Sequence, residues 1–89
     1  MNIGESNVDI RKIETFLCAA ENSSLSEAAK QLHLSQPAVS HQIKLLEEEL
    51  DVKLFIRANT GLTLTEAGHL LLPLAHQLVS DTNQLKEMM

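Results

Sequence analysis

The chain has 89 residues, 44 % of them hydrophobic and only 2 % aromatic, and its formal net charge is −5. This length suits one domain with one modest core, and the hydrophobic share excludes a wholly disordered chain. The scarcity of aromatic side chains excludes a surface that holds single strands by base stacking, and the net charge argues against a generally basic nucleic-acid-binding surface.

The single cysteine and the polar start of the chain bear on its location. Cys18 has no partner cysteine, so no disulfide can form within the chain and we expect a cytoplasmic protein. Residues 1–8 are polar and lack the basic start and apolar run of a signal peptide, and we expect them to be frayed. The longest apolar run, Leu70–Ala75, is much too short to span a bilayer, so we expect no membrane contact.

Two helices are predicted before residue 33. Apolar side chains recur at helical spacing from Ile10 to Ala20, which predicts a first helix over residues 9–21. Ser24 and Glu27 have the spacing of a capping box, in which each side chain accepts a bond from the other residue's backbone N–H. A second helix therefore begins near Leu25, and its expected buried residues are Leu25, Ala28, Ala29 and Leu32.

A third helix is predicted to follow a short turn at residues 33–34. Ser35 is its expected cap, and Pro37 lies in the first turn, where a missing N–H costs little. Helical spacing gives a buried stripe of Val39, Ile43, Leu46 and Leu50. The opposite face is small and polar near its start, and the acidic run Glu47–Glu49 near its end is interpreted as a solvated face.

The pattern changes after Asp51. Two strand-like runs, residues 54–57 and 62–64, flank the turn residues 58–61, which predicts a β-hairpin. Thr65 is the expected cap of a last helix that runs to the end of the chain, with an unfavourable Pro73 inside it. The predicted fold is mainly α, a winged helix-turn-helix with three helices, a β-hairpin wing and a long C-terminal helix.

The exposed start of the third helix suits double-stranded DNA, because a helix fits the major groove and its side chains can reach base edges. Gln36 can pair with an adenine edge, and Pro37 and Ala38 can contact a thymine methyl. Arg57 on the wing is available for a phosphate or the minor groove. Residues 25–46 carry a net charge of +1 and the remainder −6. The predicted DNA-binding segment therefore repels DNA less than the net charge of the whole chain suggests.

The string LSEAAKQLHLSQPAVSHQIKLLEEEL, followed by LFIR and LTLTEAG, resembles the N-terminal domain of the LysR-type transcriptional regulators. The likeness runs from about Ile10 to Leu72, and its motifs AA-x-x-L-x-x-SQPAVS, LF-x-R and LT-x-AG occur together and in order. It implies a sequence-specific domain that reads operator DNA as a dimer. The expected DNA contacts are Ser26, Ser35, Gln36, Pro37, Ala38, Ser40, His41, Lys44, Arg57 and Thr60.

The chain departs from the family pattern at three positions near the DNA. His41 stands where the family usually has Arg, Thr60 occupies a wing position that is often basic, and Asp51 replaces the usual Gly. Each change removes positive charge or backbone freedom, which predicts weaker phosphate anchoring. One hypothesis is that His41 is protonated in the complex; an operator affinity that does not change between pH 6 and 8 would exclude it.

The last helix is interpreted as a linker and dimerisation helix over residues 66–89, after the DNA-binding domain at 1–65 with its helix-turn-helix at 25–44 and wing at 54–64. Leucines recur every seven residues, and the resemblance implies that this helix pairs two subunits. We expect the stretch Leu70–Leu74 to pack on the chain's own core and the helix from Leu78 onward to meet a partner. The expected dimer contacts are Leu71, Ala75, Leu78, Thr82, Leu85 and Met89, with Leu74 and Met88 as the alternative to Ala75, Thr82 and Met89 for completing the seam.

Other readings of the sequence are less well supported. Cys18 is interpreted as a packing residue, and His69 and His76 lie about 10 Å apart along a helix, so one metal ion cannot bridge them. With no Gly-rich phosphate loop and no base beside Ser35 or Ser40, we expect neither an enzyme nor a cofactor or metal. The alternative is a winged-helix module for protein interaction or dimerisation without DNA binding, which the acidic charge suits. The resemblance implies an effector-binding domain after this helix in the family's much longer proteins. The 89 residues leave no room for such a domain, so we expect it to be absent from this chain.

Overall fold

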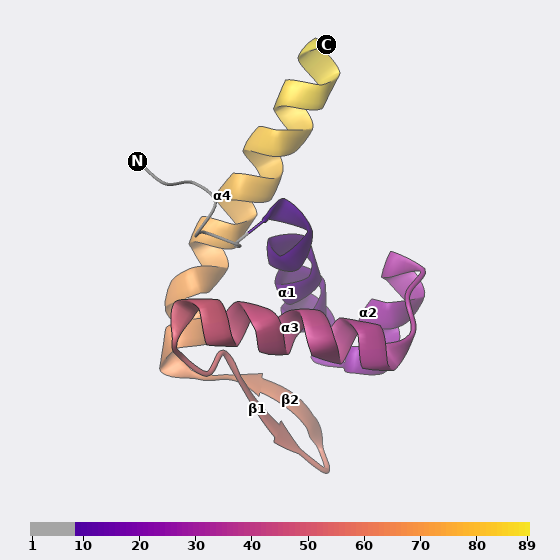
Figure 1. Ribbon diagram of the computed structural model, residues 1–89, viewed down its shortest axis with the longest axis vertical. Coiled ribbons are helices and arrows are strands. Elements are labelled where there is room, and N and C mark those ends of the chain that lie inside the picture. The colour runs from indigo at the N-terminus through magenta and orange to yellow at the C-terminus, as the bar shows by residue number, and fades with distance from the viewer. Residues whose placement is uncertain (1–8) are drawn as a thin grey trace.

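The computed structural model describes residues 9–89, which form four helices and one β-hairpin (Figure 1). The expected fraying of residues 1–8 lies outside the described residues. The mainly α winged helix-turn-helix is confirmed, and each predicted boundary lies within two residues of the observed one. The elements are α1 (Ile10–Asn22), α2 (Leu25–Leu32), α3 (Gln36–Leu50), β1 (Phe55–Ala58), β2 (Gly61–Leu64) and α4 (Glu66–Met88).

Each helix begins at a polar cap whose side-chain oxygen accepts a hydrogen bond from the backbone N–H three residues on. These caps are Asp9, Ser24, Ser35 and Thr65. Such bonds satisfy N–H groups that have no partner within the helix. The capping box predicted at α2 is only half formed: within residues 9–89, Glu27 bonds Lys30 Nζ at 3.3 Å and makes no bond to Ser24 N–H.

The first three helices end at residues with left-handed backbone conformation that are not glycine. These residues are Ser23, His33 and Asp51, with φ angles of 51°, 56° and 56°. A side chain disfavours this conformation, which is why glycine is common at such ends. Asp51 therefore adopts, with a side chain, a conformation that glycine reaches without strain.

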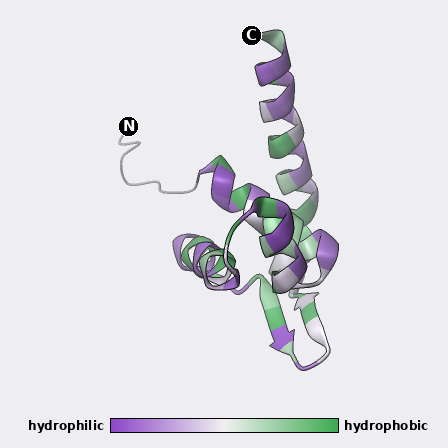
Figure 2. Ribbon diagram, turned by 90° about the vertical axis from the view of Figure 1, so that its right-hand side faces the viewer, coloured by the Kyte–Doolittle hydropathy of each residue, from purple (hydrophilic) through white to green (hydrophobic). Residues whose placement is uncertain are grey.

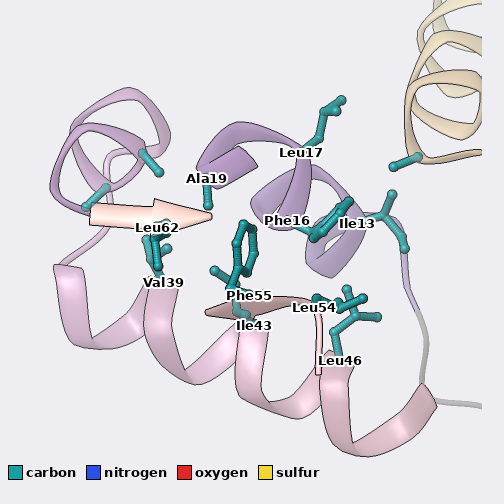
Figure 3. Close-up of a cluster of buried hydrophobic side chains, with 13 residues drawn as sticks. Ile13, Phe16, Leu17, Ala19, Val39, Ile43, Leu46, Leu54, Phe55 and Leu62 are labelled. Carbon is teal, nitrogen blue, oxygen red and sulfur yellow. The ribbon is translucent and has the colours of Figure 1, made fainter. Parts of the chain in front are cut away.

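The core lies between α1, α3 and the base of the wing (Figure 3). The rings of Phe16 on α1 and Phe55 on β1 pack at 5.4 Å between centroids and are tilted by 47°. The largest fully buried side chains are Phe16, Val39, Ile43, Leu46 and Leu54. The predicted burial of Leu50 was wrong, since its side chain is 37 % exposed. The helix ends directly after it at Asp51, whose N–H bonds the carbonyls of Glu47 and Glu48.

The first turns of α4 pack on the core through a different face from the one expected. Ala75 is fully buried and Leu71 is half-buried, whereas Leu70 and Leu74 are 70 % and 61 % exposed, so the prediction that Leu70–Leu74 packs inward was wrong for those two. Beyond Val79, α4 has no buried residue and extends away from the other elements, with hydrophobic and hydrophilic turns alternating along it (Figures 1 and 2). Pro73 lies inside α4 without ending it.

No helix within residues 9–89 is both long enough and apolar enough to cross a membrane.

Candidate nucleic-acid interface

The cap residue Ser35 fixes the start of α3, where the side chains of Gln36 and Pro37 remain exposed. Ser35 Oγ accepts a bond from the N–H of Ala38 at 3.2 Å, and Pro37 has no N–H that needs a partner. The side chains that the sequence predicted to face outward are exposed or half-buried as expected. The exposed ones are Ser35, Gln36, Pro37, His41 and Lys44, and the half-buried ones are Ala38 and Ser40.

A tight turn fixes α2 against α3. The N–H of Leu34 donates to the carbonyl of Ala29 at 3.0 Å, and the N–H of His33 donates to the carbonyl of Lys30 at 3.3 Å. Ala28 and Ala29 are both buried, and their small side chains let α2 lie close to its neighbours. The helix-turn-helix predicted over residues 25–44 is therefore built by backbone bonds and small buried side chains.

The wing stands beside the start of α3. Its strands are antiparallel with Ala58 opposite Gly61, so the loop is only Asn59 and Thr60, and Gly61 has a φ of 122° that other residues rarely adopt. The N–H of Leu62 donates to the carbonyl of Ser23 at 3.3 Å, which attaches β2 to the end of α1. The wing, the start of α2 and Gln36 enclose one groove, so four predicted contacts converge there: Ser26, Gln36, Arg57 and Thr60.

A second groove, between α3 and β1, contains a basic residue that the sequence reasoning missed. Lys44 of α3 and Arg57 of β1 line it with Ser40, as does Lys53, which precedes β1. The signal in the sequence is a basic residue directly before the LF-x-R motif. Three predicted contacts, Ser40, Lys44 and Arg57, and one unpredicted cation, Lys53, therefore share this groove.

The acidic end of α3 was misread in part. The Glu47 side chain is buried, and its Oε2 accepts bonds from the N–H groups of Leu54 at 2.7 Å and Phe55 at 3.3 Å. Glu49 Oε1 lies 2.6 Å from Lys12 Nζ on α1. Only Glu48 is exposed as predicted. The interpretation of residues 47–49 as a solvated face was therefore wrong for Glu47 and Glu49, because contacts distant in sequence bury them.

Within residues 9–89, the cysteine and the histidines join no group of three or more side chains that could hold a metal ion. Cys18 is half-buried with its Sγ 3.3 Å from Gln31 Oε1, and burial, aided by the charge of Glu21, raises the pKa of its thiol. A raised pKa leaves less reactive thiolate at neutral pH. His76 Nε2 instead lies 3.5 Å from Glu21 Oε2, joining α4 to α1.

The predicted dimer contacts on α4 fall on two faces. Ala75 and Leu71 face the chain's own core, and half-buried Thr82 donates its hydroxyl to the carbonyl of Leu78 at 2.8 Å. Burial of Ala75 excludes it from an exposed seam. The large apolar side chains that α4 does expose are Leu70, Leu74, Leu78, Leu85, Met88 and, at its cap, Met89.

Comparison with known proteins shows the family and the solved structures that this chain resembles. The family model described as bacterial regulatory helix-turn-helix protein, lysR family, matches residues 10–69. Over 73 residues the chain is 47 % identical to an HTH-type transcriptional regulator from the ibpB-leuC intergenic region of Azotobacter vinelandii, and over 72 residues 43 % identical to the regulator YxjO of Bacillus subtilis. These matches span 82 % and 81 % of this chain but 51 % and 25 % of the relatives. The crystal structure of the BenM DNA-binding domain with catB site 1 DNA matches with a TM-score of 0.87 and 33 % identity, over 91 % of each chain.

Proposed function

The chain belongs to the lysR family of bacterial regulatory helix-turn-helix proteins as a DNA-binding domain, and we propose that two copies together bind double-stranded operator DNA. In this proposal α3 enters the major groove, and the wing lies on the DNA backbone or in the minor groove. The carrying observation is the capped, exposed start of α3 with Ser26, Gln36, Arg57 and Thr60 around one groove. The likeness to a domain solved with DNA favours this function over a protein-interaction module.

The roles of the side chains follow from their chemistry and position. Gln36 presents an amide that can bond an adenine edge, and Pro37 and Ala38 offer apolar contact to a thymine methyl. Lys44 lies two turns further along α3, where a cation meets phosphates at the edge of the major groove. Ser26, Ser35, Ser40, His41, Arg57 and Thr60 are proposed as further contacts to bases or backbone.

The test of DNA binding compares Lys44→Glu with Lys86→Glu, which makes the same charge change in the last turn of α4. We expect Lys44→Glu to weaken binding to duplexes selected from a random pool by at least a hundredfold, with the unfolding midpoint unchanged. Lys86→Glu should bind within about threefold of the wild type. Equal binding by both variants, or a pool from which no sequence is enriched, would exclude the proposed recognition.

The proposed dimer uses the exposed apolar face of α4. Leu70, Leu74 and Leu78 follow at spacings of four, and Leu85 and Met88 return to the same face, so together they form a stripe that one chain leaves in water. A second α4 would cover this stripe, as in a coiled coil. Leu78→Glu should convert a concentration-dependent dimer into a monomer, whereas Gln77→Glu, its neighbour in the chain, should not. A monomer mass for the wild type at every concentration tested would overturn the dimer.

We also propose that the domain acts by binding rather than by catalysis, and that it works in the bacterial cytoplasm, where operator DNA lies. The chain spans from a quarter to half of the length of the two relatives described above. Control of transcription, and any response to a small molecule, are therefore proposed for a whole protein of this family.

A further inference from the structure

The cations of this acidic chain are unevenly placed. Of its seven lysines and arginines, Lys44, Lys53 and Arg57 line a single groove between α3 and β1. Ser40 adds a hydroxyl at the same groove, so the lining offers hydrogen-bond donors as well as charge. The three cations come from a helix, a connection and a strand, which only the tertiary fold brings together.

None of these three cations forms an ion pair within the part of the chain that the structure describes. By contrast, Lys12 and Lys30 are paired with Glu49 and Glu27. Glu47 also lines the groove, but it is buried and its Oε2 accepts bonds from two backbone N–H groups. The groove is therefore a site of local positive charge on a chain with a net charge of −5.

The backbone that carries Lys53 is held from one side. Thr65 donates its hydroxyl to the carbonyl of Lys53 at 2.5 Å and its N–H to the carbonyl of Leu54 at 3.0 Å. On the other side Glu47 accepts the N–H of Leu54 at 2.7 Å. Because the main chain is already ordered, a ligand at Lys53 need immobilise only the lysine side chain.

We propose that this groove binds one phosphate of the DNA backbone and that Lys53 is an additional contact to it, with Lys44, Arg57 and Ser40 around the same anion. The inference rests on the proposed function and extends it to a residue outside the helix-turn-helix and wing motifs. A lysine ammonium suits a phosphate as a compact point charge, and such a contact positions the protein without reading sequence. It compensates in part for His41 and Thr60, where the family pattern more often has a basic residue.

The experiment measures the affinity of Lys53→Gln for a selected operator and for a scrambled duplex at several salt concentrations. Each phosphate contact contributes about 0.9 to the slope of log affinity against log salt, so a dimer should lose about 1.8 from that slope. At 0.15 M salt this corresponds to an affinity lower by about fivefold per subunit, on both duplexes. Lys53→Arg should restore both quantities, and Lys86→Gln should leave them unchanged.

A single uncharged methylphosphonate, scanned along the operator backbone, identifies the phosphate directly. At the position that Lys53 contacts, the substitution should weaken the wild type more than it weakens Lys53→Gln, which keeps Lys44, Arg57 and Ser40 at the same phosphate. If the wild type binds DNA while Lys53→Gln keeps its slope and affinity, the phosphate contact is wrong and the proposed function stands. A loss confined to the operator with an unchanged slope also overturns it, since that is the behaviour of a base contact. Failure of the wild type to bind any duplex overturns the proposed function itself.

Discussion

The two halves of α3 differ in whether their polar side chains bond the rest of the chain or remain exposed. In the first half, from Gln36 to Lys44, the outward side chains make no hydrogen bond or ion pair within residues 9–89. In the second half Glu47 bonds the start of β1 and Glu49 bonds Lys12 on α1. One end of the helix is thus anchored so that the other can remain exposed to a ligand.

This difference explains why the net charge is a poor guide to DNA binding here. The acidic residues of the second half look repulsive in the sequence, yet two of the three hold the scaffold together. A carboxylate that already accepts hydrogen bonds or faces a lysine adds little repulsion at the distance of the reading face. The distribution of charges that remain unpaired matters more than their total.

Removing the Glu47 carboxylate should have the largest effect on the anchored half. Glu47→Leu leaves the N–H groups of Leu54 and Phe55 without their acceptor in a buried position. Each unsatisfied N–H costs about 1–3 kcal/mol, so with two of them the free energy of unfolding should fall by about 2–6 kcal/mol, measured by urea titration. DNA affinity should fall too, because the wing loses its attachment to α3.

The matched control is Glu47→Gln. Both N–H groups bond the same oxygen, Oε2, so an amide oxygen can still accept from them. This variant should therefore lose less than half as much stability as Glu47→Leu. Equal unfolding midpoints for Glu47→Leu and the wild type would show that the Glu47 carboxylate does not anchor the second half of α3.

The Lys12–Glu49 pair should show a smaller effect that depends on which partner is removed. Both side chains are mostly buried, and Glu49 Oε2 is buried without a hydrogen-bond partner among the described residues. Lys12→Met leaves Glu49 uncompensated and should cost about 1–2 kcal/mol of stability. The double variant Lys12→Met/Glu49→Leu should cost less than the sum of the two single changes, as measured in a double-mutant cycle. Additive costs would mean that the pair does not anchor α3 to α1.

Local features of the fold were predictable from the sequence, and contacts between distant residues were not. Caps at Ser24, Ser35 and Thr65 and the turn before Gly61 depend on neighbouring residues, so their chemistry is visible in the chain. The groove at Lys53 and the burial of Glu47 depend on where β1 crosses α3. A sequence read without its tertiary contacts treats both as surface charges.

The rotation of α4 shows the same limit. Residues 70–72 are all leucine and Leu74 follows, so the apolar stripe is too wide to say which leucines face inward. A shift of one residue turns a helix by about 100°, which is the difference between a seam through Leu71 and Ala75 and one through Leu70 and Leu74. Only packing against α1 selects between them, and it places Ala75 inside.

The smallest predicted effect concerns the end of the anchored half, where Asp51 has a φ of 56°. Asp51→Gly removes the strain of a side chain in this conformation but increases the freedom of the unfolded chain, so we expect a net gain of about 0.5–1 kcal/mol in unfolding free energy. Asp51→Asn removes the same charge while keeping a side chain. If the unfolding free energy rises in both variants, the cause is the lost charge. If it rises only in Asp51→Gly, the cause is the backbone strain that the φ angle of Asp51 indicates. Since the segment after Asp51 is held by Glu47, neither change should alter the position of the wing, and the salt dependence of DNA binding should stay the same in both.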